Sequence, residues 1–128
     1  MIYLDSSVVL AYLLAEDRCP PVSIWDETLG SSRLLEYEVW NRVHANRSPV
    51  DYANDAHALL SRIQFTELTP AVLKRALEAF PVPVRTLDSL HLSTAEYLHK
   101  ITNDVKLASF DRRMLATARA LNIPLYEF

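Results

Sequence analysis

Glycine and cysteine are nearly absent from this chain of 128 residues, which contains one of each, Gly30 and Cys19. Loops that cradle phosphates with backbone N–H groups need several glycines, so dinucleotide-binding and nucleoside-triphosphate-binding loops are excluded. A single cysteine excludes an intramolecular disulfide and a cysteine-cluster metal site, and it is typical of a protein of the reducing cytoplasm. The sequence also lacks an apolar run of membrane-spanning length and a basic segment before its apolar start, so neither a membrane span nor a signal peptide is expected.

Positive charge is in the minority, because 13 Lys and Arg residues face 16 Asp and Glu residues and the formal net charge is -3. A protein that holds nucleic acid through bulk positive charge is therefore not expected, and such binding would depend on local groups of basic residues. With 50% hydrophobic and 23% charged residues, the composition is that of an ordinary globular protein, and the length predicts one domain over residues 1–128.

The opening stretch MIYLDSSVVLAYLL predicts a buried strand that leads directly into a helix. The succession of β-branched, aromatic and aliphatic side chains in residues 2–4 suits a strand that is buried on both faces. Ser6 and Ser7 are expected to cap the apolar helix 8–14. Asp5 stands at the junction, where open α/β sheets place their ligand chemistry, although an acid there can also simply help to cap the helix.

Helices and short strands alternate through the rest of the chain. Further helices are expected over 22–29, closed by Gly30, from Leu35 to Pro49 and over 50–63. Others are expected over 71–80 after Thr69 and Pro70, after Thr86 as its N-cap, and over 114–121 after Asp111. Further strands are expected over 31–34, 65–68, 105–109 and 124–128. This order predicts a single α/β domain with a central parallel sheet of about four to five short strands and helices on both faces.

Acidic residues are expected to gather at one edge of this sheet. Asp5 and Asp111 follow the carboxyl ends of two proposed strands, and Asp88 and either Glu36 or Glu38 lie near helix starts. Each acid alone can be explained by the helix dipole, but crowded carboxylates repel one another unless a cation neutralises them. Mg²⁺ and Mn²⁺ prefer such oxygen ligands, and one or two of these ions can activate a water for displacement at phosphorus. The joint pattern therefore predicts phosphoryl chemistry.

Four motifs carry a resemblance to a known family: MIYLDSSVVLAYL, SRLLEYEV, RTLDSLHLSTA and LASFDRRM. With these motifs over nearly its whole length, the chain resembles PIN-domain ribonucleases, and specifically the VapC-type toxins of bacterial and archaeal toxin–antitoxin pairs. The resemblance implies that the metal-binding and catalytic acids are Asp5, Glu38, Asp88 and Asp111. Glu36 lies two residues from Glu38, and helical periodicity cannot separate the two. The resemblance also implies supporting roles for Ser7 and Ser109, although Ser6 and Ser7 could equally be ordinary helix caps.

The function that the resemblance implies is that of a small cytoplasmic endoribonuclease that uses Mg²⁺ or Mn²⁺ and a metal-activated water, and leaves a 5′-phosphate and a 3′-hydroxyl. It further implies a toxin that halts translation, forms a homodimer and is restrained by a small antitoxin. From their apolar content, the early helices with Leu13, Leu14, Trp25 and Trp40 are the expected antitoxin groove. A PIN nuclease of RNA processing and a catalytically inactive RNA- or protein-binding module are the alternatives.

Other residues of the chain could contact RNA. Arginines cluster in sequence around the motifs, and they are Arg33, Arg42, Arg47, Arg85, Arg112 and Arg113. Arginine pairs bidentately with phosphate, and Arg85 and Arg112 are the expected substrate contacts. Trp25, Tyr37 and Trp40 can stack on bases, but aromatic residues at helical spacing are more often part of a core or an interface. His91, three residues after Asp88, is expected to be a partly buried histidine with satisfied hydrogen bonds rather than a substrate contact. The remaining histidines lack metal-ligand spacing and are expected to be surface or packing residues.

Overall fold

The computed structural model describes residues 1–46 and 52–128 and contains one four-stranded parallel sheet. The strands are β1 (Ile2–Leu4), β2 (Leu29–Ser32), β3 (Ile63–Thr66) and β4 (Lys106–Ala108), in the order β3-β2-β1-β4. The helices are α1 (Ser6–Leu13), the 3-10 helix η1 (Val22–Asp26), α2 (Leu34–Ala45), α3 (Ala53–Leu60), α4 (Pro70–Ala76), α5 (Thr86–Thr102) and α6 (Arg112–Ala120). The predicted α/β fold with a central parallel sheet is confirmed.

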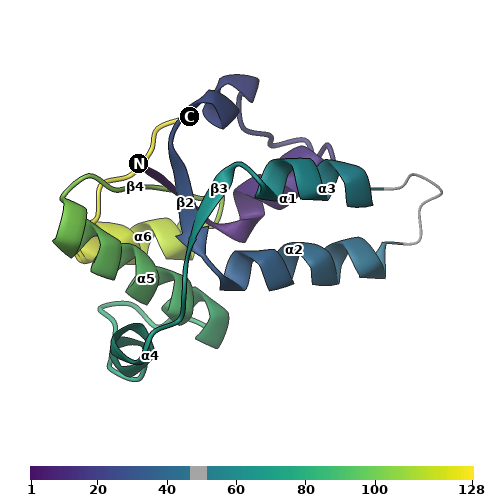
Figure 1. Ribbon diagram of the computed structural model, residues 1–128. Coiled ribbons are helices and arrows are strands. Elements are labelled where there is room, and N and C mark those ends of the chain that lie inside the picture. The colour runs from purple at the N-terminus through teal and green to yellow at the C-terminus, as the bar shows by residue number, and fades with distance from the viewer. Residues whose placement is uncertain (47–51) are drawn as a thin grey trace.

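Helices cover both faces of the sheet (Figure 1). Ile2 and Leu4 of β1 pack into one hydrophobic cluster with residues of α1, α2 and α3, whereas Tyr3 packs into the other with residues of α5 and α6. Helix α4 lies outside α5. Each fully buried aliphatic side chain contributes about 1.5–3 kcal/mol, so a strand buried on both faces is held firmly. The central position of β1 therefore gives the residue after Leu4 a rigid base.

Two predicted helix starts are confirmed by their capping hydrogen bonds. The side chain of Thr69 accepts a hydrogen bond from the N–H of Val72, and Pro70 follows it as the first residue of α4. Asp111 is the N-cap of α6, and its Oδ1 accepts the N–H groups of Arg113 and Met114. These side-chain oxygens satisfy N–H groups that the first helical turn leaves without partners.

The prediction that Gly30 closes a helix over 22–29 is wrong. Only one short 3-10 helix forms there, and Gly30 lies inside β2, paired with Tyr3 and Gln64. A Cβ atom on Gly30 would collide with the Sδ atom of Met1. Glycine at this position therefore leaves room for the Met1 side chain, which packs directly on the strand, and it does not end a helix.

The predicted helix caps near two of the acidic residues are also wrong. Helix α1 already begins at Ser6, its N-cap is Asp5, and no side chain caps it. The hydroxyls of Ser6 and Ser7 bind the carboxylates of Glu38 and Asp5 instead. Helix α5 begins at Thr86 itself, so the N-cap is the preceding arginine. The serine hydroxyls do not cap the helix because hydrogen bonds to a charged carboxylate are stronger than those to a backbone N–H group.

The remaining differences concern the ends of elements. Residues 124–128 form one isolated bridge between Leu107 and Leu125 rather than a strand. Pro124 has no N–H to donate, and the aromatic rings of Tyr126 and Phe128 pack near Phe110. Helices α3 and α4 end earlier than predicted, and strands β2 and β3 begin earlier. The expected helix end at Pro49 and helix start at Val50 lie outside the described residues.

Candidate active site

The candidate site lies at the carboxyl ends of the paired central strands β1 and β4. These strands run parallel, with Leu4 beside Ala108, and the N–H of Asp5 donates to the carbonyl oxygen of Ala108 at 3.1 Å. Asp5 follows β1 directly, and Ser109 follows β4 directly. The pairing therefore brings together two residues that are 104 positions apart in the chain.

Asp5 is buried, and one oxygen of its carboxylate is bound by two serine hydroxyls. Oδ2 accepts hydrogen bonds from Ser7 and Ser109, each at 2.8 Å. Both hydroxyls are themselves oriented, because Ser7 Oγ accepts the N–H of Phe110 and Ser109 Oγ accepts the N–H of Asp111. Asp5 Oδ1 receives no hydrogen bond from the described residues and is not among their buried polar atoms without a partner, so it reaches the accessible surface.

Asp111 is the second acid at this edge of the sheet. Its Oδ1 lies 2.9 Å from the N–H of Arg113 and 3.2 Å from the N–H of Met114, which fixes the side chain at the N-terminus of α6. Within residues 1–46 and 52–128, nothing donates to its Oδ2. The expected helix-capping role and an available carboxylate oxygen therefore coexist in Asp111.

Asp88 lies in the first turn of α5, where it is partly buried and close enough to the other acids to interact with them. Burial and the negative charges of Asp5 and Asp111 raise the pKa of the Asp88 carboxyl, against the opposing charges of His91 and Arg85. The negative charges of Asp5 and Asp111 are thus close enough to affect the ionisation of Asp88 at this edge of the sheet.

Glu38 of α2 belongs to an adjoining group that includes a buried histidine. Its Oε1 lies 2.5 Å from Nε2 of His91, and its Oε2 accepts the hydroxyl of Ser6 at 3.3 Å. Nδ1 of His91 lies 2.8 Å from the hydroxyl of Tyr3, which in turn accepts the N–H of Ser32. The interpretation of His91 as a buried, hydrogen-bonded residue is confirmed, whereas the sequence analysis did not anticipate its partners Glu38 and Tyr3.

The protonation of this group follows from its surroundings. Burial lowers the pKa of His91, but the hydrogen bond to Glu38 and the negative charges of Glu38, Asp5 and Asp88 raise it by more. Burial also raises the pKa of Tyr3 far above its usual value, so the phenol keeps its proton. The spacing of His91 one helical turn after Asp88 was the signal that could have placed it beside the acids.

The structure places Glu36 and Glu38 in different surroundings. Glu36 faces Arg33, with a carboxylate oxygen 3.5 Å from a guanidinium nitrogen. Glu38 points to the opposite side of α2, toward His91 and Ser6. Of the two acids that the sequence left open, Glu38 is therefore the one whose contacts adjoin the edge where Asp5 lies.

The donor atoms at this edge suit a hard cation, although they do not form a complete set of ligands. No group of three or more His, Cys, Asp or Glu side chains among the described residues is arranged to hold a metal ion. The available donors are nevertheless carboxylate oxygens, which Mg²⁺ and Mn²⁺ prefer. The charges of Asp5 and Asp111 also disfavour the ionised form of Asp88, and a bound cation would relieve that repulsion.

The arginines near the motifs differ in how available they are. Arg33 is paired with Glu67 at 2.7 Å as well as with Glu36. Arg85 and Arg112 are exposed at the N-terminal ends of α5 and α6, next to the acidic edge. Arg47 lies outside the described residues. The two expected phosphate contacts, Arg85 and Arg112, thus have suitable positions, and their role stays a prediction.

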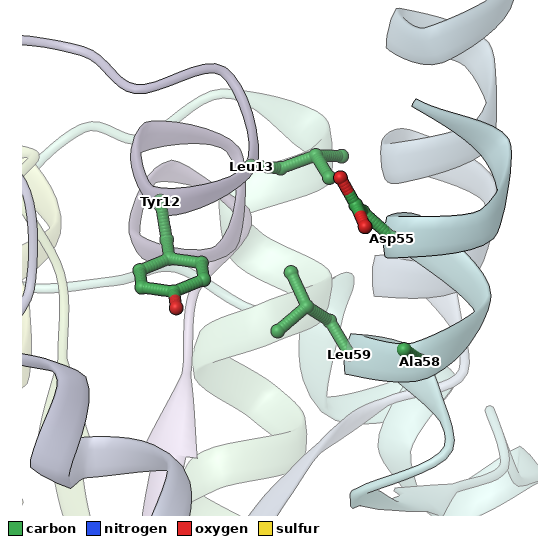
Figure 2. A pocket seen from close by; sticks show the side chains of 5 residues that line it. All are labelled: Tyr12, Leu13, Asp55, Ala58 and Leu59. Atoms are coloured by element: carbon green, nitrogen blue, oxygen red, sulfur yellow. The ribbon is translucent and has the colours of Figure 1, made fainter. Parts of the chain in front are cut away.

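A pocket opens between α1 and α3 (Figure 2). It is lined by Tyr12, Leu13, Asp55, Ala58 and Leu59. The expected groove shares only Leu13 with this pocket. Trp25 is buried in the core beneath Tyr12, so its inclusion in an exposed groove is wrong, and Trp40 packs against His57 on α3.

Comparisons with known proteins agree on one family. The family model of the PIN domain matches residues 2–124. Two curated relatives are both named Ribonuclease VapC35, and they come from the CDC 1551 / Oshkosh and ATCC 25618 / H37Rv strains of Mycobacterium tuberculosis. The chain is 29% identical to each over 129 residues, which span 96% of this chain and 93% of the relative. The matched region contains every residue of the acidic edge.

Proposed function

Because this chain belongs to the PIN domain family, we propose that it is a metal-dependent endoribonuclease of the VapC toxin type. The observation that carries the proposal is the acidic edge, where burial together with the charges of Asp5 and Asp111 raises the pKa of Asp88. Carboxylates crowded at one site repel one another and destabilise a fold, so their presence calls for a functional reason. The name Ribonuclease VapC35, borne by relatives that match nearly the whole chain, supports RNA as the substrate.

The proposed ligands of the ion, Mg²⁺ or Mn²⁺, are Asp5, Glu38, Asp88 and Asp111. When bound, such an ion lowers the pKa of a water and stabilises charge on the phosphate oxygens of the scissile bond. Ser7 and Ser109 hold the Asp5 carboxylate through Oδ2 and leave Oδ1 available. Arg85 and Arg112 are proposed to bind phosphates of the RNA on either side of the acids.

The toxin role, the homodimer and the cytoplasmic location belong to the same proposal and rest on the VapC-type resemblance. The cognate antitoxin is proposed to insert an apolar side chain into the pocket between α1 and α3 (Figure 2). Leu13 and Leu59 supply apolar walls there, and Asp55 would favour a basic residue on the antitoxin. No described helix of the chain is long and apolar enough to cross a membrane.

The first test is cleavage of total RNA by the purified protein, freed of any partner, with Mg²⁺, with Mn²⁺ and with chelator. Discrete products that carry 5′-phosphates and appear only with metal are expected. Asp5→Asn and Glu38→Gln should abolish them, whereas Glu36→Gln, which alters the neighbouring acid that faces Arg33, should not. No cleavage by the folded wild-type protein in either metal would overturn the nuclease assignment and favour a binding module.

The antitoxin pocket can be tested separately from catalysis. Ala58→Arg would fill the pocket from the exposed side of α3 and should weaken binding of the antitoxin at least about tenfold without reducing RNA cleavage. Ala116→Arg, at an exposed position of α6, is the matched control and should leave binding unchanged. Unaltered binding by Ala58→Arg would exclude this pocket as the anchor site.

A further inference from the structure

We propose that His91 is a positioning residue that, braced by Tyr3, fixes the carboxylate of Glu38 in its metal-binding orientation. The inference rests on the proposed function, because Glu38 matters only if the acidic edge binds metal. His91 itself is almost fully buried and has no open path to substrate. Its proposed effect on the reaction therefore passes through Glu38.

A continuous set of hydrogen bonds connects the sheet to Glu38. The N–H of Ser32, at the end of β2, donates to the Tyr3 hydroxyl at 3.1 Å. That phenol lies 2.8 Å from Nδ1 of His91, and Nε2 of His91 lies 2.5 Å from Oε1 of Glu38. This set of hydrogen bonds begins at a backbone N–H group of the sheet. The Glu38 carboxylate at its other end is therefore held by the rigid core.

The direction of these bonds follows from the atoms available. Ser32 N–H occupies one lone pair of the Tyr3 oxygen, and the phenol keeps its own proton at neutral pH. The neutral arrangement that satisfies every atom has Tyr3 donating to Nδ1 and His91 carrying its proton on Nε2. In the doubly protonated ring Nε2 carries a proton as well, so the donor to Glu38 is present in either state.

Both oxygens of Glu38 are held by donors from other elements. His91 of α5 binds Oε1, and Ser6 of α1 binds Oε2 at 3.3 Å. A free glutamate side chain on a helix samples many rotamers, and ordering them costs binding free energy each time a metal binds. Each ionised carboxylate oxygen retains a second lone pair, so these contacts orient Glu38 without excluding it as a ligand.

The test compares two substitutions of His91 that each introduce a polar amide but differ in the length of the side chain. The amide nitrogen of His91→Gln can occupy the place of Nε2 and still donate to Glu38, whereas the shorter His91→Asn reaches Tyr3 only. Mn²⁺ affinity, measured by calorimetric titration without RNA, should weaken about tenfold or more in His91→Asn, the usual effect of losing such a supporting contact. His91→Gln should stay within about threefold of the wild type because it keeps the donor. Unfolding midpoints should confirm that both variants fold.

A double-mutant cycle distinguishes positioning from a general structural effect. In a Glu38→Gln background, His91→Asn should cause no further loss of Mn²⁺ affinity, because its action passes through Glu38. An equal loss in both backgrounds, or tighter Mn²⁺ binding by His91→Asn, would overturn the proposal. If the wild-type protein neither binds Mn²⁺ nor cleaves RNA, the proposed function fails instead.

Tyr3→Phe tests the brace itself. It removes one oxygen from a buried ring and leaves both Ser32 N–H and His91 Nδ1 without this partner. Mn²⁺ affinity should fall, but by less than in His91→Asn, since Nε2 can still reach Glu38. An affinity equal to that of the wild type would show that His91 needs no support from the sheet.

Discussion

The two ends of α5 place acids in opposite electrostatic settings. In its C-terminal half, Glu96 lies 2.8 Å from Nε of Arg75 and 3.7 Å from Nζ of Lys100. In its first turn, Asp88 forms no ion pair with any described Lys or Arg, and burial together with Asp5 and Asp111 raises its pKa. One helix therefore carries both a neutralised acid and an acid that its surroundings repel.

This difference shows that basic residues neutralise an acid of the chain at a position where the acid contributes only to stability. The Arg75 and Glu96 pair ties α4 to α5, which fits a purely structural contact. The acidic edge uses hydroxyl groups and a histidine in place of arginine and lysine, as at Asp5 and Glu38. Hydroxyl donors hold the Asp5 carboxylate in place while leaving its charge for a cation from solution, which supports the metal-binding proposal.

The largest expected effect is on catalysis. Asp88→Asn should reduce RNA cleavage by more than about 100-fold, because the loss of a ligand exceeds the roughly 10- to 100-fold effect of supporting contacts. Glu96→Gln, on the same helix, should leave cleavage unchanged. Initial rates at saturating Mn²⁺ would measure both effects. Equal rates for the two variants would show that Asp88 is no more important for cleavage than the neutralised Glu96.

The second effect concerns stability with metal. Mn²⁺ at about 100 times its dissociation constant should raise the free energy of unfolding of the wild type by about 2.7 kcal/mol. Glu96→Gln should be stabilised equally, and Asp88→Asn much less. Urea unfolding with and without Mn²⁺ measures this, and chelator should reverse it. Equal stabilisation of all three proteins would place the metal elsewhere.

A smaller effect is expected from the hydroxyls that hold Asp5. Ser109→Ala removes one donor from a buried carboxylate and should lower the free energy of unfolding by about 2 kcal/mol, as for other hydrogen bonds to charged groups. The matched control is Ser93→Ala, since Ser93 is a buried serine that donates to the carbonyl oxygen of Ser89, and it should cost about 1 kcal/mol. Urea unfolding without metal would compare them, and a smaller loss for Ser109→Ala would contradict this account.

The smallest effect is a pH dependence of stability without metal. The folded-state pKa of Asp88 is raised above its usual value of 3.8, so the folded protein binds the proton more tightly than the unfolded chain does. Ionisation of Asp88 therefore costs stability, and this cost is absent below about pH 4 and complete above the raised pKa. Asp88→Asn should accordingly gain stability relative to the wild type as the pH rises from acidic to neutral. If the difference in stability between Asp88→Asn and the wild type were constant with pH, the pKa of Asp88 would not be raised by folding.

Sequence patterns anticipated the elements of the fold better than their ends. Gly30 suggested the end of a helix because glycine commonly terminates helices, but it lies inside β2, and the side chain of Met1, which precedes β1, packs where its Cβ would be. Ser6 and Ser7 suggested helix caps because serine commonly caps, but Glu38 and Asp5 bind their hydroxyls. In both cases a contact distant in sequence overrode a local preference.

The amino-acid sequence by itself determined the alternation of strands and helices and the placement of Asp5 and Asp111 just beyond two buried strands. These features are local, because a strand and the residue that follows it are adjacent in the sequence. Only the tertiary structure decided that Glu38 rather than Glu36 turns toward the acidic edge, and that His91 joins Glu38 to Tyr3. Those contacts connect residues 53 and 88 positions apart, and helical periodicity specifies which face a residue occupies but not what lies opposite that face.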